Sequence, residues 1–205
     1  MDNTIETMEN DTVNIKIYQD EDAQSSREWD NLGTMVCWHR NYVLGDKEHL
    51  FPKDFDLEEI NRLLKELDIA VILPLYLYDH SGITMSTSNS TYPFNCPWDS
   101  GCVGFIYVTK TALRKELSKQ RLSKKSLEYA KRVLLQEVET YDEYLTGQVY
   151  GYVIEDKSGE HLDSCWGFYG YNYCNQEAES AAEYQVKTLT QAGRAELAGQ
   201  LSLIS

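Results

Sequence analysis

The stretch YPFNCPWDSGCVGFIYV, which ends in an apolar run, carries the residue types of a nucleophilic active site. In such a site Cys96 or Ser100 would be the nucleophile, and His80 would be the base that takes its proton. Asp99 or Asp79 would orient the imidazole ring. The first part of the stretch belongs to a long polar loop, residues 79–101, and catalytic groups often lie on loops. One hypothesis is therefore a hydrolase-type enzyme that uses this loop.

The same stretch also fits a structural turn, and two features favour that interpretation. Ser100 lacks the GxSxG frame of a nucleophile elbow, and no base adjoins Cys96 in the sequence to lower its pKa. In a turn, Asp99 would accept backbone hydrogen bonds and Trp98 would cover the start of the next strand. We therefore expect no catalytic residue here and keep His80, Cys96 and Asp99 as the alternative set.

The histidines and cysteines offer ligand types for zinc but not the usual ligand spacing. The four histidines and five cysteines include no CxxC or HExxH pair. We therefore expect neither a metal nor a cofactor. An odd number of cysteines is most simply explained by reduced thiols packed as small apolar groups, which is typical of a cytoplasmic protein.

Nothing in the sequence predicts export or a membrane span. The first residues, MDNTIETMENDTVN, are acidic and lack the basic and apolar regions of a signal peptide. The longest strongly apolar run, Ile69 to Leu77, is too short to cross a bilayer. We expect a cytoplasmic protein without membrane contact.

A second candidate site is the segment DSCWGFYGYNYC, which concentrates large aromatic residues. Such residues fill cores, but tryptophan and tyrosine also dominate the hot spots of protein interfaces. Core packing and partner binding both remain open for this set. Its members are Trp166, Tyr169, Tyr171 and Tyr173.

The net charge of −14 is unevenly distributed. Residues 1–30 carry −7 and residues 110–132 carry +7, so everything outside this second segment carries −21. Phosphate binding needs clustered lysine and arginine, so we expect no direct nucleic-acid binding and favour a basic protein partner. The alternative is that the charge only maintains solubility. The candidate partner-binding acids are Asp20, Glu21, Asp22, Glu28, Asp30, Glu137, Glu139, Asp142 and Glu143.

The basic segment, residues 110–132, predicts two amphipathic helices. It can contact phosphates, pair with the acidic N-terminal third, or present a solvated face. A solvated face is the commonest outcome for such a charge run. The segment lacks interleaved aromatic residues and a nucleic-acid-binding motif, so its signal for nucleic acid is weak.

The elements that must position these residues follow from periodicity and turn signals. Alternating or bulky apolar runs predict strands, and apolar residues at helical spacing predict helices. Pro74 places its strand at a sheet edge or beside a bulge, and Gly193 is expected to interrupt the last helix. The expected strands are VNIKIY, GTMVCWHR, AVILPLYLY, CVGFIYV, GQVYGYVIED and HLDSCWGFYG, the last two joined by a hairpin turn at Gly159. The expected helices are LEEINRLLKEL capped by Asp56, residues 109–120, residues 123–145 capped by Ser123, and a tail from Gln176.

About six strands, with helices between and after them, predict an α+β fold. We expect one mixed or antiparallel sheet with helices packed on it, in a single domain with a C-terminal helix. The expected divisions are a loose acidic tail at 1–12, an α+β core domain at 13–175 and a helical extension at 176–205.

Three sequence blocks resemble an uncharacterised family of small acidic proteins encoded by bacteriophages, plasmids and conjugative elements. The resemblance covers about residues 27 to 170 and brings no catalytic assignment with it. It implies the context of a mobile element, in which small acidic proteins often inhibit host defence, some by presenting carboxylates in place of phosphates. The blocks are REWDNLGTMVCWHRNYVLGD, LPLYLYDHSGITMSTSNSTYPFNCPWDSGCVGFIYVTK and EVETYDEYLTGQVYGYVIEDKSGEHLDSCWGFYG.

Together these observations favour a non-enzymatic accessory protein in the cytoplasm of a bacterial host. It is expected to inhibit a nucleic-acid-targeting defence complex, of anti-CRISPR or antirestriction type, by protein–protein contact through an acidic surface. The alternatives are the hydrolase described above and a structural or regulatory phage protein.

Overall fold

The computed structural model describes residues 4–47, 51, 57–87, 93–94 and 98–204, with side chains of the last helix up to residue 192. The chain forms two compact units. Unit 1 comprises Met1–Ala23 and Gly147–Ser205, and unit 2 comprises Gln24–Thr146. Unit 2 is therefore an insertion between two strands of unit 1.

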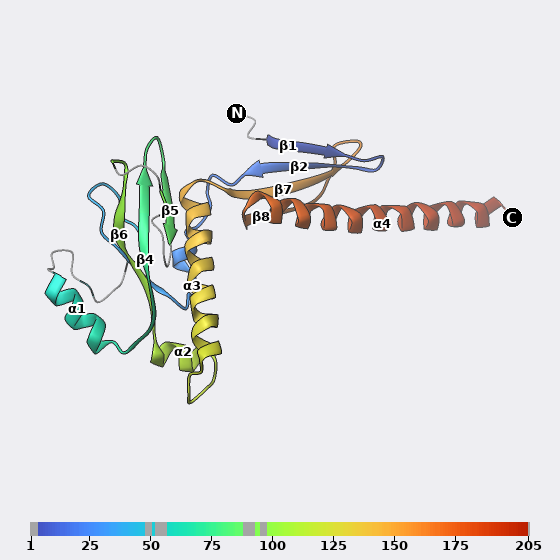
Figure 1. The fold of residues 1–205 in the computed structure, drawn as a ribbon. Helices are drawn as coiled ribbons and strands as arrows, with labels where there is room; N and C mark the ends of the chain where they lie inside the picture. The colour runs from blue at the N-terminus through green and yellow to red at the C-terminus, as the bar shows by residue number, and fades with distance from the viewer. Residues whose placement is uncertain (1–3, 48–50, 52–56, 88–92, 95–97, 205) are drawn as a thin grey trace. The chain divides into compact units, whose positions relative to one another are not determined.

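Unit 1 is a four-stranded antiparallel sheet with a long helix on one face (Figure 1). The strand order is β1-β2-β7-β8, and α4 follows the last strand after a single residue. The elements are β1 (Thr4–Glu9), β2 (Val13–Gln19), β7 (Val149–Asp156), β8 (His161–Tyr169) and α4 (Tyr171–Ile204).

The core of unit 1 follows from period-two alternation in the strands. In β2, Val13, Ile15 and Ile17 are buried, and Ile15 and Ile17 pair with Ile154 and Tyr152 of β7. Helix α4 meets this face with small residues one helical turn apart, which lets its backbone approach the sheet closely. These are Cys174, Ala178 and Ala182.

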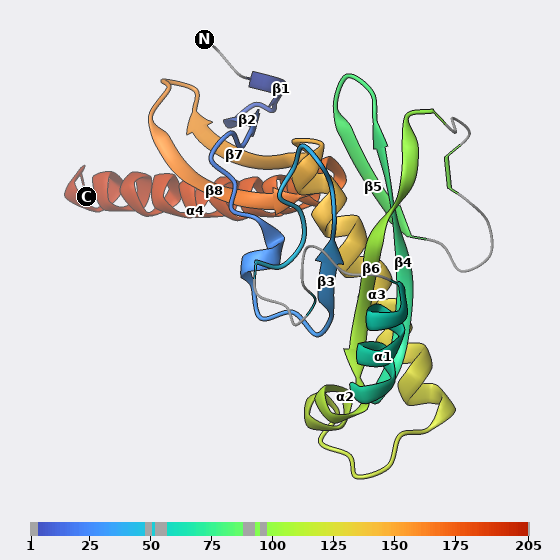
Figure 2. The ribbon, with the colours of Figure 1, turned by 90° about the vertical axis from the view of Figure 1, so that its left-hand side faces the viewer.

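Unit 2 is a second four-stranded antiparallel sheet, in the order β3-β6-β4-β5 (Figure 2). Its longest helix, α3, packs on one face of the sheet through β5, β4 and β6. The elements are η1 (Ser26–Glu28), β3 (Thr34–Cys37), α1 (Leu57–Glu66), β4 (Ile69–Asp79), β5 (Ile83–Thr87), β6 (Ser100–Thr109), α2 (Lys110–Glu116) and α3 (Lys124–Leu145).

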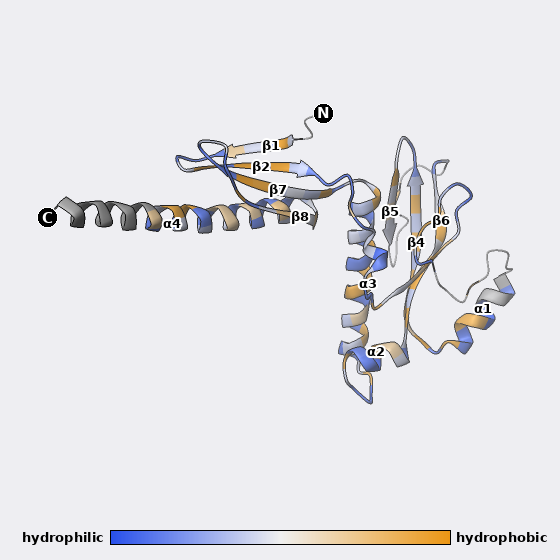
Figure 3. Ribbon diagram, turned by 180° about the vertical axis from the view of Figure 1, so that it is seen from behind, coloured by the Kyte–Doolittle hydropathy of each residue, from blue (hydrophilic) through white to orange (hydrophobic). Residues whose placement is uncertain are grey.

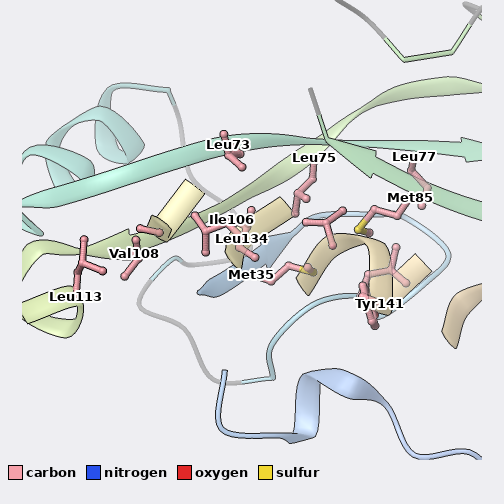
Figure 4. Packing of buried hydrophobic residues seen from close by; sticks show 13 residues of the cluster. Met35, Leu73, Leu75, Leu77, Met85, Ile106, Val108, Leu113, Leu134 and Tyr141 are labelled. Atoms are coloured by element: carbon pink, nitrogen blue, oxygen red, sulfur yellow. The ribbon is translucent and has the colours of Figure 1, made fainter. Parts of the chain in front are cut away.

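Both faces of the unit 2 sheet are packed. The larger cluster lies between the sheet and α3, where aliphatic residues of β4 and β6 meet Ala130, Leu134 and Val138 of the helix (Figure 4). A second, aromatic cluster covers the other face and contains Val36, Phe51, Phe105 and Tyr107, with leucines of α1 against it. No helix in the part of the chain that the structure describes is long and apolar enough to cross a membrane.

The start of α3 confirms the predicted cap. The Ser123 hydroxyl accepts the Ser126 N–H, and the Ser126 hydroxyl accepts the Ser123 N–H, which makes a capping box. The predicted hairpin turn is also confirmed, because Gly159 has φ +88° between β7 and β8. Asp56, the expected cap of α1, lies outside the described residues.

Several expectations from the sequence need correction. Within the described part of the chain, eight strands form two sheets where the sequence predicted about six strands in one sheet, because β1 and β5 carry weak apolar patterns. Pro74 lies in a central strand, so the edge position is wrong, but the alternative of a nearby bulge is confirmed by a register shift between Leu75 and Tyr76. Helix α4 begins at Tyr171, five residues before the predicted start, and continues through Gly193 without interruption.

Candidate functional site

The sheet face of unit 1 opposite α4 carries a tryptophan that lies on the backbone of a glycine. A Cβ atom placed on Gly151 would lie 2.3 Å from Cε3 and 2.4 Å from Cδ2 of Trp166, so the indole occupies the space a side chain would fill. Tyr18 pairs with Gly151 across the strands, and its ring centroid is 5.9 Å from that of Trp166. We call Tyr18, Gly151 and Trp166 the aromatic face. Its indole remains 49% exposed.

Balanced ion pairs accompany the aromatic face. Lys16 and Glu155 alternate with the core positions of β2 and β7, and their side chains are 2.7 Å apart. Lys157 donates to the Asn14 side chain at 2.6 Å and lies 3.8 Å from Glu9. The aromatic face is therefore bordered by paired charges rather than by a run of carboxylates.

The structure does not bring the other predicted aromatic residues to Trp166. Tyr171, the first residue of α4, packs against the core of unit 1 and edge-on to Tyr150, and its hydroxyl donates to Glu6. Tyr173 lies on α4 and is 55% exposed. Tyr169 is half-buried at the end of β8, where it pairs with Val149.

The acidic residues after β2 form a turn at the edge of unit 1. The Asp20 carboxylate accepts the Asp22 N–H at 3.2 Å, and the Asp20 N–H donates to the Val149 carbonyl at 2.8 Å. Asp20 is half-buried, whereas Glu21 and Asp22 are exposed. This segment is thus an ordered, solvent-facing acidic turn.

Negative charge is concentrated in unit 1. Unit 1 contains fifteen acidic and four basic residues, a net −11, and unit 2 contains eighteen and fifteen, a net −3. Most of the excess charge of −14 therefore belongs to the smaller unit.

Glu137, a predicted partner-binding residue, is committed to the interior of unit 2. Its carboxylate lies 2.9 Å from Arg27 Nη1 and accepts the backbone N–H groups of Leu32 and Gly33. Arg27 also forms a two-point contact with Asp46, at 2.8 and 3.1 Å. Only 11% of the Glu137 side chain and 3% of the Arg27 side chain are exposed, so little of either is available to a partner.

Burial and ion pairing have opposite effects on the pKa of Arg27. Desolvation lowers the pKa of its guanidinium, but hydrogen bonds to Asp46 and Glu137 and their negative charges outweigh it. The resulting pKa lies above the ordinary value, so the group stays charged. This network ties η1 and the chain on either side of β3 to helix α3.

Of the remaining acidic residues of unit 2 that were predicted to bind a partner, some make structural contacts and others are exposed to solvent. Asp142 accepts the Met85 N–H at 2.6 Å, which anchors β5 to α3. Burial raises the pKa of Asp142 and, together with the charges of Glu139 and Asp142, that of Glu143. Glu139 and Asp30 are exposed, and Glu28 forms an exposed pair with Lys47 at 2.9 Å.

The alternative catalytic residues are only partly brought together. His80 Nδ1 lies 3.3 Å from Asp99 Oδ2, which is the orientation a carboxylate gives to a catalytic imidazole. His80 is 62% exposed, however, and Cys96 lies outside the described residues. The expected packing of Trp98 over the next strand is wrong, because its side chain is 93% exposed.

A second histidine–aspartate pair lies in a hollow of about 390 Å³ near this loop. His39 Nε2 lies 3.9 Å from Asp79, and its Nδ1 accepts the Asn41 N–H at 3.2 Å. That acceptor role places the proton of the neutral ring on Nε2, so both nitrogens face protein groups and neither is open as a base. The Tyr42 ring stacks on His39 at 5.0 Å.

The thiols and possible metal ligands of the described residues offer little chemistry. Burial and the charge of Asp46 raise the pKa of Cys37 to about 12, which keeps it a neutral thiol. Among the described residues, Cys37, Cys102, Cys165 and Cys174 are free, and no three or more histidine, cysteine or acidic side chains gather as a metal site.

Tyr18, Gly151 and the Arg27 pairs were not predicted from the sequence. Alternation in VNIKIYQ places Tyr18 on the face of Lys16, and a glycine amid the bulky residues of VYGYV marks space for a ring. Nothing local pairs Arg27 with Glu137, which lies 110 residues further along the chain. Comparison with known proteins found no matching family model, no matching curated protein and no matching solved structure.

Proposed function

We propose that this protein is a phage or mobile-element accessory protein that inhibits a host nucleic-acid-targeting defence complex by binding it in the host cytoplasm. The observation that supports it most is the net −11 of unit 1. Proteins that hold nucleic acid present basic surfaces, so an acidic unit is attracted to them and competes with phosphates. The resemblance is the reason for proposing host defence as the setting, and the charge of unit 1 is the reason for proposing a basic, nucleic-acid-binding protein as the partner.

The aromatic face gives unit 1 an anchor for that contact. Exposed tryptophan on a rigid sheet is typical of interface hot spots, because it brings a large contact area at small entropic cost. An aromatic residue on an open sheet can also stack on nucleic-acid bases, but a unit with net −11 repels phosphates. Protein contact is therefore favoured for this unit.

Phage plating on hosts that each carry one defence system tests the proposal. Expression of the wild-type protein should restore plating on at least one host. Trp166→Ala, or Asp20→Lys with Glu21→Lys and Asp22→Lys, should abolish the effect while the variants stay folded. The matched control reverses three exposed acids of unit 2, Glu66, Glu116 and Glu128, and should retain the effect. Equal loss in both triple variants would leave only a general charge effect and contradict the proposal.

A hydrolase remains the second candidate because His80 and Asp99 are 3.3 Å apart. The two functions separate in one comparison. If the protein acts as an enzyme, His80→Ala should abolish protection although the variant still binds the defence complex. If it acts by binding, His80→Ala should protect as well as the wild type.

A further inference from the structure

The turn between α2 and α3 gathers a patch of basic side chains, with Glu116 and Glu128 as the acidic residues of the same segment. Within the described residues none of these basic side chains forms an ion pair, and five of the seven fall within eleven consecutive residues. Figure 3 shows the hydrophilic colouring of this end of unit 2. The basic patch consists of Lys115, Lys119, Arg121, Lys124, Lys125, Lys131 and Arg132.

The backbone holds this patch in an ordered conformation. Helix α2 ends with Ser118 at φ +51°, and the Lys119 N–H donates to the Arg114 carbonyl at 3.0 Å, which closes the helix end. The capping box of Ser123 then fixes the start of α3. On α3, Lys125 and Arg132 are seven residues apart and face away from the buried stripe of Ala130 and Leu134, so the patch continues up one side of the helix.

The position of these charges is unfavourable for the isolated protein. Lys124 and Lys125 occupy the first turn of α3, where the helix dipole favours anions, and no acidic residue lies in that turn. Residues 110–132 carry +7 while the rest of unit 2 carries −10, so the excess positive charge of unit 2 is concentrated in this one segment. A bound polyanion would offset this unfavourable placement of cations at the start of α3.

The residue composition of the basic patch indicates which class of partner it would bind. A protein interface would need aromatic or apolar anchors, and Leu127 is the one large apolar residue of residues 110–132 with an exposed side chain. A membrane-surface helix would insert its apolar face, but Leu134 and Val138 of α3 are buried in the core. Single strands bind through stacked bases, whereas Tyr129 is half-buried with Arg132 beside its ring. Clustered cations without a stacking platform fit the phosphate backbone of a duplex.

We infer that the basic patch of unit 2 binds the phosphate backbone of double-stranded nucleic acid without reading its sequence. This replaces the expectation of no direct nucleic-acid binding, which was based on the charge of the rest of the chain. The inference uses no residue of unit 1 and does not depend on the proposed partner. If both proposals hold, unit 1 would bind the protein component of a nucleoprotein complex, and the basic patch of unit 2 would bind its nucleic acid.

Fluorescence anisotropy with labelled DNA and RNA duplexes tests the inference on the full chain. Binding should weaken steeply with salt, with log Kd rising by about 4 to 6 per unit of log salt, as five to seven neutralised phosphates require. Preference for one duplex type identifies whether DNA or RNA is the source of the phosphates. Failure to bind either duplex at low salt would overturn the inference, as would binding to phosphatidylserine vesicles in place of both duplexes.

Two triple variants of equal charge change locate the surface. Lys119→Glu, Lys124→Glu and Lys125→Glu should lower duplex affinity more than about tenfold, since each contact contributes separately. Lys65→Glu, Lys157→Glu and Lys187→Glu remove exposed lysines elsewhere and should change it far less. Lys115→Gln, Lys119→Gln and Arg121→Gln, outside the α3 helix, serve if the first triple fails to fold. Equal weakening by the patch and control triples would overturn the inference.

Discussion

Trp166 rests its indole ring on the backbone of Gly151, on the sheet face opposite α4. Any side chain at position 151 must displace that ring, because the nearest ring atom would lie 2.3 Å from the new Cβ. The aromatic face thus depends on the glycine in β7 as much as on the tryptophan in β8.

Gly151→Ala should therefore disturb the aromatic face specifically. We expect a loss of about 1–3 kcal/mol in unfolding free energy, the usual cost of overpacking, and a shift in the Trp166 contribution to fluorescence, assigned by comparison with Trp166→Phe. Gly101→Ala is the matched control, since a Cβ there meets nothing within 4 Å. An unchanged Trp166 emission in Gly151→Ala would contradict this packing.

Removal of Arg27 should be the most damaging single change in unit 2. Arg27→Ala leaves the buried carboxylates of Asp46 and Glu137 without their cation, which we expect to cost about 3–5 kcal/mol. Glu137→Gln should cost less, because the amide oxygen can still accept the Leu32 and Gly33 N–H groups. Urea unfolding measures both.

The exposed pair of Lys47 and Glu28 provides the contrast to Arg27. Lys47→Ala should leave the urea midpoint unchanged, because exposed ion pairs contribute little. A midpoint shift for Lys47→Ala as large as that for Arg27→Ala would mean that burial does not decide the strength of these pairs.

The parts of the fold that were predicted from sequence rest on local signals. Ser123 caps α3 through atoms three residues away, and Gly159 turns a hairpin whose strands flank it. Pairing across the inserted unit has no such signal: β2 and β7 are neighbours although unit 2 separates them in the chain. One sheet was therefore predicted where there are two.

The same difference between local and long-range signals applies to the residues of the candidate site. The acidic character of the turn at Asp20 is visible in the sequence. The role of Glu137 depends on Arg27, which lies far away in the chain, so helical spacing alone could not separate a solvated carboxylate from a buried one. Charge composition indicated the kind of partner but not which carboxylates are free to meet it.

Asp142 should make stability depend on pH. Burial raises its folded-state pKa above the ordinary value of 3.8, so the folded protein holds the proton more tightly than the unfolded chain. This contribution to stability is fully present below the ordinary pKa and is lost as pH rises through the raised folded value. The free-energy gain of Asp142→Asn over the wild type should therefore grow as pH rises through this window, measured by urea unfolding at several pH values.

The hydrogen bond from Met85 separates charge from geometry at this position. Asparagine keeps an oxygen that can accept the Met85 N–H, whereas Asp142→Ala removes it and should cost about 1–3 kcal/mol at neutral pH. If Asp142→Asn follows the same pH dependence as the wild type, Glu143, whose pKa burial also raises, is the group that titrates.

The first turn of α3 should gain stability when its two lysines are replaced by acids. Lys124→Glu with Lys125→Glu places carboxylates where the helix dipole favours them, with an expected gain of about 0.3–1 kcal/mol per site. Lys124→Gln with Lys125→Gln is the matched control: it removes the same two cations from the basic patch but adds no carboxylate to the helix terminus. Thermal unfolding should place the first pair above the control, and duplex binding should fall in both. Such a result would mean that the lysines are kept at the cost of stability, as expected where a surface serves binding. If the first pair proves no more stable than its control, the dipole is not opposing the lysines, and that part of the case for a polyanion site fails.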